Sequence, residues 1–478
     1  MFQKLTGTIL LMALCCTLSF GQETWTIEKC IQYSQQNSLR VKQAENSVEQ
    51  AQLTEQESKN ARYPDLNAST SGNVSFGRTI DPVTNQFVSQ TIGSNSLSIN
   101  GGITVYNGGR IRNTIKQSGI AVEAAKSNTE QIKTDIALQV AQAYLQVLLD
   151  EEALANADKR LEQTQAQLEQ TDKLIQAGTR PQSERLEIIA QIARDEQAIV
   201  SQQNAVEISY LNLKQLLELK PDYEFQVEKP SVVIPGNANP EAYTLDAVYN
   251  KALNNQPMIR RDELNVKSSE LGIDIAKSLR LPSVRFFANV NSFYSNQVLE
   301  LLDEGTDAFD DAIPTLINGS NAAVQFPTKV DQVFGRRSYF NQLNDNFGQG
   351  IGVSVNIPIY NQNQTKIAME RAKLDVLNRQ ITSQQNKQQL KTDIQRAIAN
   401  ARANKKQFEA SEKTVAALKD TYRNTEKRYQ LGAVNTFEFT TAKNNLDQSE
   451  VDLIIAKYNY LYSLKVVDFY QGKKITLR

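Results

Sequence analysis

The chain has 478 residues, which is long enough for two or three domains of ordinary size. Its 52 Lys and Arg residues balance 53 Asp and Glu residues, so no net charge draws the chain to nucleic acid or acidic lipid. Histidine is absent, which removes the commonest general base and the commonest metal ligand and disfavours ordinary catalysis.

Residues 1–21 have the pattern of a secretory signal peptide. Lys4 gives a positive start, Ile9 to Leu18 form an apolar core, and Ser19 to Gly21 end it with small residues at the cleavage positions. The apolar stretch is too short to remain as a membrane-spanning helix. We therefore expect an exported mature chain.

The cysteines predict neither a lipid anchor nor a disulfide framework. Cys15 and Cys16 are preceded by Leu14 and Cys15, where a lipoprotein signal needs a small residue, so acylation is disfavoured. Only Cys30 remains after cleavage, and it is expected to be a small buried apolar residue on a helix. No later segment has about 18 consecutive apolar residues, so no transmembrane helix is predicted.

The mature chain contains the same pattern twice. Trp25 to Glu28 recurs as Tyr243 to Asp246 at an offset of 218, and Ile103 to Asn107 recurs as Ile357 to Asn361 at an offset of 254. The difference of 36 residues indicates an insertion in the second copy, between Pro282 and Ile357. We predict a tandem duplication with these boundaries: signal peptide 1–21, first repeat 22–235, second repeat 236–478.

Each repeat is predicted to hold a helix, a strand, a loop, a second strand and a long helical hairpin. The strands are expected near 66–76, 97–105, 284–294 and 351–359. Each has about 10–13 residues with one apolar face, the pattern of a membrane β-strand. The connecting loops, about 78–94 and about 295–348, are expected to face outside, and the second contains the insertion.

The hairpin helices are unusually long. Gly and Pro are absent from Ile120 to Ala177, and helix from about Arg110 gives about 68 residues, or roughly 100 Å. Apolar residues then recur every seven positions, the seam of a left-handed coiled coil. The first stripe is Val140, Val147, Leu154, Leu161, Leu168 and Ile175, and its equivalent is Ile394, Ala401, Phe408, Val415, Tyr422 and Tyr429.

The returning helices continue this heptad pattern. Their stripes are Ile192, Ile199, Val206 and Leu213 in the first repeat, and Leu446, Leu453, Tyr460 and Val467 in the second. Gly178 and Gly432 lie where the hairpins reverse, as helix-ending glycines do. Pro181 suits the first turn of the first returning helix.

Four strands alone cannot be stable in lipid, because an open sheet edge leaves backbone donors and acceptors unpaired there. Three subunits would close the ring with twelve strands and twelve long helices. The soluble alternative is a four-stranded sandwich that carries exposed hairpins.

Several short segments resemble those of TolC-type outer membrane factors. They are Trp25 to Cys30 with Asn37, Arg62-Tyr63-Pro64, Tyr106 to Gly109, and the hairpin tips Ile175 to Thr179 and Tyr429 to Ala433. The resemblance covers essentially the whole mature chain, including the duplication. It implies a TolC-like trimeric α/β barrel that combines all-α and membrane-β parts, with four β-strands and two long coiled-coil hairpins per subunit.

The same resemblance implies a function and partners. The homotrimer would be a passive exit channel for efflux or type I secretion, with a β-barrel in the outer-membrane lipid and a helical barrel across the periplasm. Its tips would meet a periplasmic adaptor protein and an inner-membrane transporter. Neither a cofactor nor a nucleic-acid partner is expected.

A barrel that closes at one end needs a constriction near the helix reversals. The polar residues that follow the two tip glycines are the candidates: Arg180, Ser183, Glu184, Asn435, Thr436 and Glu438. In the family, a tyrosine just before the second tip glycine bonds to an acidic residue on the first hairpin, and Tyr429 and Glu184 occupy those positions, with Ser183 beside Glu184. Glu438 matches a ring of carboxylates that selects cations.

The sequence departs from the best-known gate at two positions. Thr441 stands where a second ring acid is often found, and Val434 replaces an arginine found in some members. The latching network is therefore expected to be weaker or differently wired. Each candidate is also compatible with an ordinary solvated or packed residue near the tip.

Two other classes of protein compete with this interpretation. An enzyme is disfavoured because the chain has no nucleophile elbow, phosphate loop or metal-ligand cluster. A periplasmic adaptor or structural coiled-coil protein is the better rival, although adaptors lack duplicated membrane-like strands. The acidic run from Asp303 to Asp311 is compatible with a Ca²⁺ site but is more typical of a solvated loop.

Overall fold

The structure is a computed structural model that describes residues 24–80, 85–89, 91–229, 239–303, 313–317, 320–324 and 333–476. The predicted signal peptide (1–21), with Cys15 and Cys16, and the acidic run from Glu304 to Asp311 lie outside these residues. The chain forms two compact units. The hairpin unit comprises Met1–Leu53, Ser118–Ser269 and Leu374–Arg478, and the sheet unit comprises Thr54–Gln117 and Glu270–Lys373.

The helices confirm the internal duplication. Each helix of the first repeat has an equivalent in the second whose two ends are shifted by 218 residues before the sheet and by 254 after it. The equivalent pairs are α2 (Ile27–Asn37) and α6 (Leu245–Asn255), α3 (Leu39–Asn60) and α7 (Pro257–Ser278), α4 (Arg110–Gln176) and α9 (Gln364–Gln430), and α5 (Gln182–Leu216) and α10 (Thr436–Tyr470).

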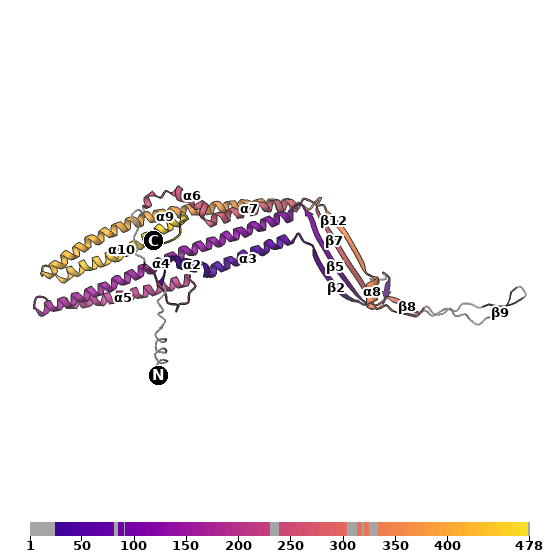
Figure 1. Cartoon of the computed structure of the whole chain (residues 1–478), viewed down its shortest axis with the longest axis horizontal. Helices are drawn as coiled ribbons and strands as arrows, with labels where there is room; N and C mark the ends of the chain where they lie inside the picture. Colours follow the sequence, from indigo (N-terminus) through magenta and orange to yellow (C-terminus); the bar gives the residue numbers. More distant parts are fainter. Residues whose placement is uncertain are drawn as a thin grey trace, which may run out of the picture. The chain divides into compact units, whose positions relative to one another are not determined.

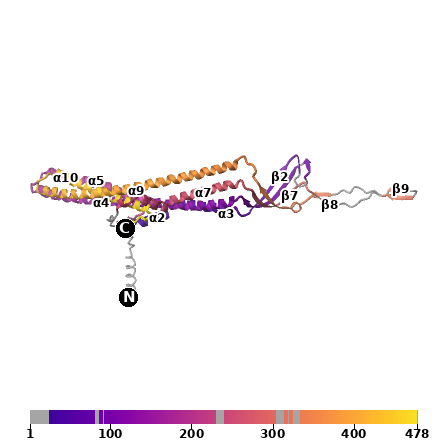
Figure 2. The same cartoon turned by 90° about the horizontal axis from the view of Figure 1, so that it is seen from above.

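The two hairpins have the predicted length and differ from the prediction in detail. Helices α4 and α9 each have 67 residues, and both hairpins reverse at the same end of the hairpin unit (Figures 1 and 2). The single opening helix predicted for each repeat is two helices instead, because the chain becomes extended at Ser38 and at Gln256. In the described residues no helix combines the length and apolarity needed to cross a bilayer.

One antiparallel sheet contains the four predicted strands. Its order is β12-β7-β5-β2, so the two repeats meet in the middle and β2 and β12 form the edges (Figure 1). The strands are β2 (Asp65–Ser75), β5 (Ile92–Asn107), β7 (Ser283–Ser295) and β12 (Gly348–Asn356).

The sheet has one apolar and one polar face. Phe286 pairs with Ile103 on one side and with Val353 on the other, and all three point to the same face by strand alternation. On that face Leu66 is 77% exposed and Ile351 is 91% exposed. The opposite face carries a ladder of serines and asparagines, with hydroxyl contacts of 2.8 Å between Ser69 and Ser98 and 2.6 Å between Ser71 and Ser96.

The predicted strand ends are wrong at two places. β5 begins at Ile92, inside the segment predicted to be a loop. β12 ends at Asn356 and does not reach residue 359, because Pro358 has no backbone N–H to donate and Gln362 and Asn363 take positive φ angles of 55° and 61°.

The two predicted loops contain structure of their own. The second holds the short helix α8, whose Gln342 side chain accepts from the Ser295 N–H at the end of β7 at 3.0 Å. The elements within the two loops are β3 (Arg78–Ile80), β4 (Phe87–Ser89), β8 (Leu299–Asp303), β9 (Ile313–Ile317), β10 (Ser320–Val324), β11 (Val333–Arg336) and α8 (Tyr339–Asp345).

The main core of the hairpin unit surrounds α4. Tyr144 is 1% exposed and donates to the carbonyl oxygens of Trp25, at 3.0 Å, and Glu228, at 2.9 Å. This ties β1 (Thr24–Trp25) and β6 (Gln226–Val227), which pair in parallel, to the hairpin. A short 3₁₀ helix (Pro240–Ala242) precedes α6. Cys30 is fully buried, and burial raises the pKa of its thiol to about 12, so it is an inert core residue.

The heptad stripes are buried only along part of each hairpin. Val140, Val147 and Leu213 are fully buried, as are their equivalents in the second repeat. Nearer the tip, Leu154 and Leu161 are only half-buried, and the residues that pack inside are small ones: Ala157, Thr164 and Thr171. The outer half of the predicted stripe therefore keeps apolar surface available for further packing.

Candidate constriction site at the hairpin tips

The two tips share a backbone design. Gly178 and Gly432 both have φ of 74°, a left-handed conformation that ends the preceding helix. The Asn435 side chain caps α10 by accepting from the Glu438 N–H at 2.9 Å. Pro181 is the N-cap of α5, one residue earlier than its predicted place in the first helical turn. These turns place the polar candidates at the start of each returning helix.

Tyr429 and Glu184 join the two tips. The Tyr429 hydroxyl donates to the Glu184 carboxylate at 2.9 Å, and the two residues are 5% and 8% exposed. The Thr436 hydroxyl lies 3.4 Å from the same phenol oxygen. Burial raises the pKa of the Tyr429 phenol above its ordinary value, so the hydroxyl stays neutral and able to donate. The pair predicted from the resemblance is in hydrogen-bond contact.

Arg180 completes this junction from the first tip. Its guanidinium is 3.3 Å from the Glu184 carboxylate, donates to the Tyr429 carbonyl oxygen, and lies 4.3 Å from the centre of the Tyr429 ring. Both members of the ion pair have only 11% of their side-chain surface exposed, so solvent screens it less than an exposed pair. We call Arg180, Glu184 and Tyr429 the tip cluster.

Aromatic packing supports the tip cluster. The Tyr429 ring stacks on Phe439 at 4.7 Å, and Phe439 also contacts Tyr422 at 5.6 Å. Val434, at the position where some family members carry arginine, is 6% exposed and belongs to this apolar group. Sequence reasoning missed Phe439, although its place three residues after Thr436 on the same helix face was a usable signal.

The remaining candidates lie outside the tip cluster. Ser183 is exposed. Glu438 has 52% of its side chain exposed and forms an ion pair of 3.4 Å with Arg428, a partner that the sequence reasoning missed. The predicted site residues thus separate into a buried junction and an exposed acidic position.

A second, unpredicted link between the hairpins lies farther from the tips. Arg160 on α4 is 3.2 Å from Asp195 on α5 and 3.2 Å from Asp447 on α10. Lys443 donates to Asp447 at 3.0 Å, and Thr164 donates to Asp195 at 2.6 Å. The side chains of Asp195, Asp447 and Lys443 are 1%, 6% and 3% exposed. We call Arg160, Asp195, Lys443 and Asp447 the buried charge cluster.

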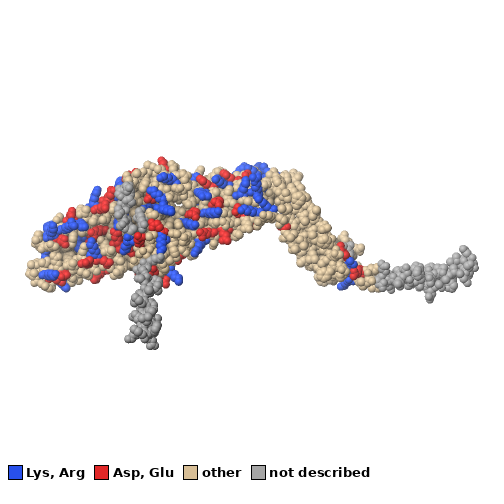
Figure 3. Space-filling view, in the orientation of Figure 1, with Lys and Arg blue, Asp and Glu red and all other residues tan. Residues whose placement is uncertain are grey.

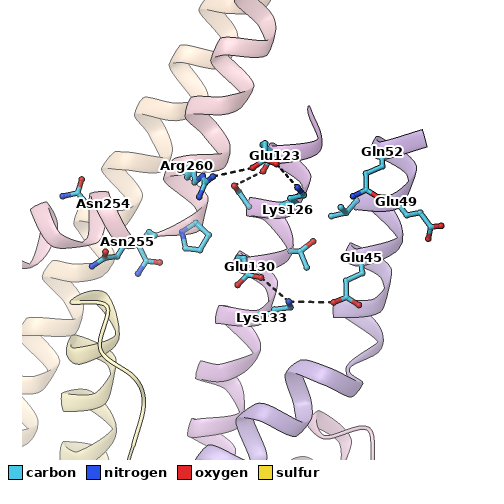
Figure 4. Close-up of a pocket in the computed structure, with 15 residues that line it drawn as sticks. Glu45, Glu49, Gln52, Glu123, Lys126, Glu130, Lys133, Asn254, Asn255 and Arg260 are labelled. Carbon is cyan, nitrogen blue, oxygen red and sulfur yellow. Dashed lines mark hydrogen bonds and ion pairs between the residues drawn. The ribbon is translucent and has the colours of Figure 1, made fainter. Parts of the chain in front are cut away.

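A pocket of about 760 Å³ lies between α3, α4 and the start of α7 (Figure 4). Six of its charged residues are joined by ion pairs: Glu123 pairs with Lys126 at 2.8 Å and with Arg260 at 3.6 Å, and Lys133 pairs with Glu130 at 3.2 Å and with Glu45 at 3.9 Å. The described residues contain no group of three side chains suited to hold a metal ion. This pocket is therefore best described as a groove bridged by ion pairs.

Comparisons with known proteins agree with this architecture. Three solved structures share the fold: CusC (TM-score 0.73, 16% identity, 96% of this chain and 96% of that chain covered), the CmeC outer membrane channel of Campylobacter jejuni (0.72, 15%, 95% and 90%) and the outer membrane protein VceC of Vibrio cholerae (0.71, 15%, 93% and 96%). No curated protein sequence is detected as a relative. A family model described as outer membrane efflux protein matches residues 30–218 and 248–472, which cover most of both repeats. The chain belongs to the outer membrane efflux protein family.

Proposed function

We propose that this chain is one of three identical subunits of a passive exit channel through the outer membrane. The observation that carries the proposal is the sheet of only four strands, with an exposed apolar face and with β2 and β12 as edges. In lipid those edges must be paired, and pairing β12 of one copy with β2 of the next closes a ring. Family membership supports the outer membrane location and a transport role rather than an enzyme.

The hairpins would continue this barrel as a helical tunnel across the periplasm. The half-buried outer heptad stripe supports contact with hairpins of neighbouring copies, since apolar seams of this kind are normally covered. At the tips Leu431 is 84% exposed and Phe437 is 76% exposed, which supports docking of a periplasmic adaptor protein that recruits an inner-membrane transporter. The channel would serve a tripartite efflux pump or a type I secretion system.

The tip cluster would hold the tunnel closed at its periplasmic end. It connects the first and second hairpins of one chain through a buried hydrogen bond and a largely buried ion pair. Some family members carry an arginine at the position of Val434, which here packs in the apolar group. In this chain the positive charge beside Glu184 comes from Arg180. Opening would require the second hairpin to separate from the first and break these contacts.

Reconstitution tests the proposed channel directly. The mature chain should require detergent for extraction from membranes, should migrate as a complex of three chains in detergent, and should give discrete conductance steps in planar lipid bilayers. Release of a single-chain protein with the soluble periplasmic fraction, without conductance, would instead support the rival periplasmic adaptor or structural coiled-coil protein.

Glu438 would set the cation preference of the entrance, with Arg428 opposing it. Three copies of Glu438 around a narrow pore favour cations, and the Arg428 charge 3.4 Å away partly offsets each carboxylate. We expect Glu438→Gln to lower the cation-to-anion permeability ratio and Arg428→Gln to raise it, both measured from reversal potentials in a salt gradient. An unchanged ratio in Glu438→Gln would show that this residue is only a solvated helix position.

A further inference from the structure

Five exposed basic residues gather where the sheet meets the helices. They are Arg62, Arg110, Arg112, Arg280 and Lys366, all within the sheet unit, and we call them the basic belt. Arg62 and Arg280 lie three residues before the first residues of β2 and β7. Arg110 and Arg112 lie in the first turn of α4 after β5, and Lys366 lies in the first turn of α9 after β12. Figure 3 shows Lys and Arg side chains concentrated at this end of the sheet.

The belt recurs in both repeats. Arg62 and Arg280 are equivalent at the offset of 218, and Arg112 and Lys366 are equivalent at the offset of 254. Positive charge therefore occupies the same two places in each copy. This repetition indicates that positive charge is needed along the whole helix end of the sheet, and not only for one local contact.

Nearby carboxylates form their ion pairs with other residues. Asp65, at the start of β2, is paired with Arg285 at 2.5 Å. Glu55 and Asp274 are paired with lysines of their own helices, at 2.8 and 2.9 Å. Within the part of the chain that the structure describes, no belt residue has a carboxylate at ion-pair distance. A chain with net charge −1 thus holds a local excess of positive charge at one level.

The opposite end of the sheet carries acidic as well as basic residues. There Arg337 is paired with Glu300, at 2.7 Å, and with Asp345, so the charge of this arginine is compensated. Between the two ends lies the exposed apolar face, for example Leu66 and Ile351. Uncompensated basic residues at one border of an apolar band are placed to meet negative headgroups of a single leaflet.

We propose that the basic belt binds the phosphate groups of anionic glycerophospholipids in the leaflet that borders the helix end of the sheet. The proposal rests on the proposed membrane-inserted barrel and adds a lipid specificity to it. Four of the five residues are arginines, whose planar guanidinium groups bind phosphate oxygens through two parallel hydrogen bonds. Each basic residue near an anionic surface is expected to favour such lipids about fivefold.

Lipid selectivity of the reconstituted protein tests the belt. The wild type and the variant Arg62→Gln/Arg280→Gln would be placed in phosphatidylcholine vesicles that contain increasing fractions of phosphatidylglycerol, and spin-labelled phosphatidylglycerol would report its enrichment in the lipid shell. We expect enrichment around the wild type and a roughly ten- to thirtyfold weaker preference in the variant. The matched control Lys413→Gln/Lys419→Gln removes two exposed charges from α9 within the hairpin unit and should leave the preference unchanged.

Three other results would overturn the proposal in distinguishable ways. Equal enrichment around wild type and variant would show that the belt does not bind headgroups. A change in the ion selectivity of the pore, with unchanged lipid preference, would place these residues in the lumen. Failure of the wild type to insert into vesicles of any composition would contradict the proposed barrel itself, and the belt with it.

Discussion

Replacing Tyr429 by Phe together with Glu184 by Gln is expected to raise the resting conductance of the channel. The double variant removes the buried hydrogen bond between the two hairpins and the charge that Arg180 neutralises. A hydrogen bond to a charged group contributes about 1.5–3 kcal/mol, so its loss in each subunit should raise the open fraction at least about tenfold. Phe keeps the stacking on Phe439, and the aromatic packing should survive. Single-channel recording in planar bilayers measures the change.

Tyr422→Phe is the matched control for this latch. Tyr422 lies seven residues before Tyr429 on α9 and packs against the same Phe439, but its hydroxyl interacts with Glu426 on its own helix. Removal of the Tyr422 hydroxyl should leave the resting conductance at the wild-type level.

Because burial raises the pKa of the Tyr429 phenol above 10.0, the wild-type latch should persist as pH rises to that value and weaken only above it. A double variant that stays closed would contradict the latch.

The sequence predicted the architecture well because the relevant signals are local and occur twice. The absence of Gly and Pro, the helix-ending Gly178 and Gly432, and strand alternation each act within a few residues. The repeat then supplied an independent check, since the ends of α4 and α9 are offset by 254 at both termini. The early end of β12 could also have been predicted from the sequence, because Pro358 has no backbone N–H to donate to a neighbouring strand.

The sequence could not predict which face of each hairpin is buried. A heptad stripe shows that one side of a helix seeks a partner, but it does not show whether the partner is the same hairpin or another one. In this chain the apolar stripe is fully buried near Val147 and only half-buried near Leu161. Thr164 contacts Asp195 on α5, and Arg160 contacts Asp447 on α10, and neither partner is close in sequence.

The same reason explains which site contacts were predicted. The resemblance paired Tyr429 with Glu184 because both positions match a known pattern, whereas Arg180 was only one of several polar candidates near the tip. Its contacts with Tyr429 depend on how the two tips approach each other. The buried charge cluster joins three helices whose residues are up to about three hundred positions apart, and no local pattern indicates such a meeting.

Replacing Arg160 by Met is expected to destabilise the hairpin unit strongly. The substitution keeps the aliphatic bulk but leaves the Asp195 carboxylate, 1% exposed, without a cation. Asp447 keeps Lys443 at 3.0 Å but loses its link to α4. Removing one partner of a buried ion pair costs about 3–5 kcal/mol, because the remaining charge stays desolvated. Denaturant unfolding in detergent, followed by the fluorescence of Trp25, the only tryptophan, measures the loss within this unit.

Two further variants separate this cost from a general effect of losing charge on α4. Arg160→Met/Asp195→Asn removes both charges while leaving an oxygen that accepts from Thr164, so it should be more stable than Arg160→Met alone. Lys173→Met removes a pair with Glu169 on the same helix whose side chains are 71% and 73% exposed, and its unfolding midpoint should stay close to that of the wild type. If Arg160→Met proved as mild as Lys173→Met, the cluster would be a solvated contact. A large loss that the second substitution relieves would instead show that the cost comes from the uncompensated buried charge of Asp195 more than from the lost packing of Arg160.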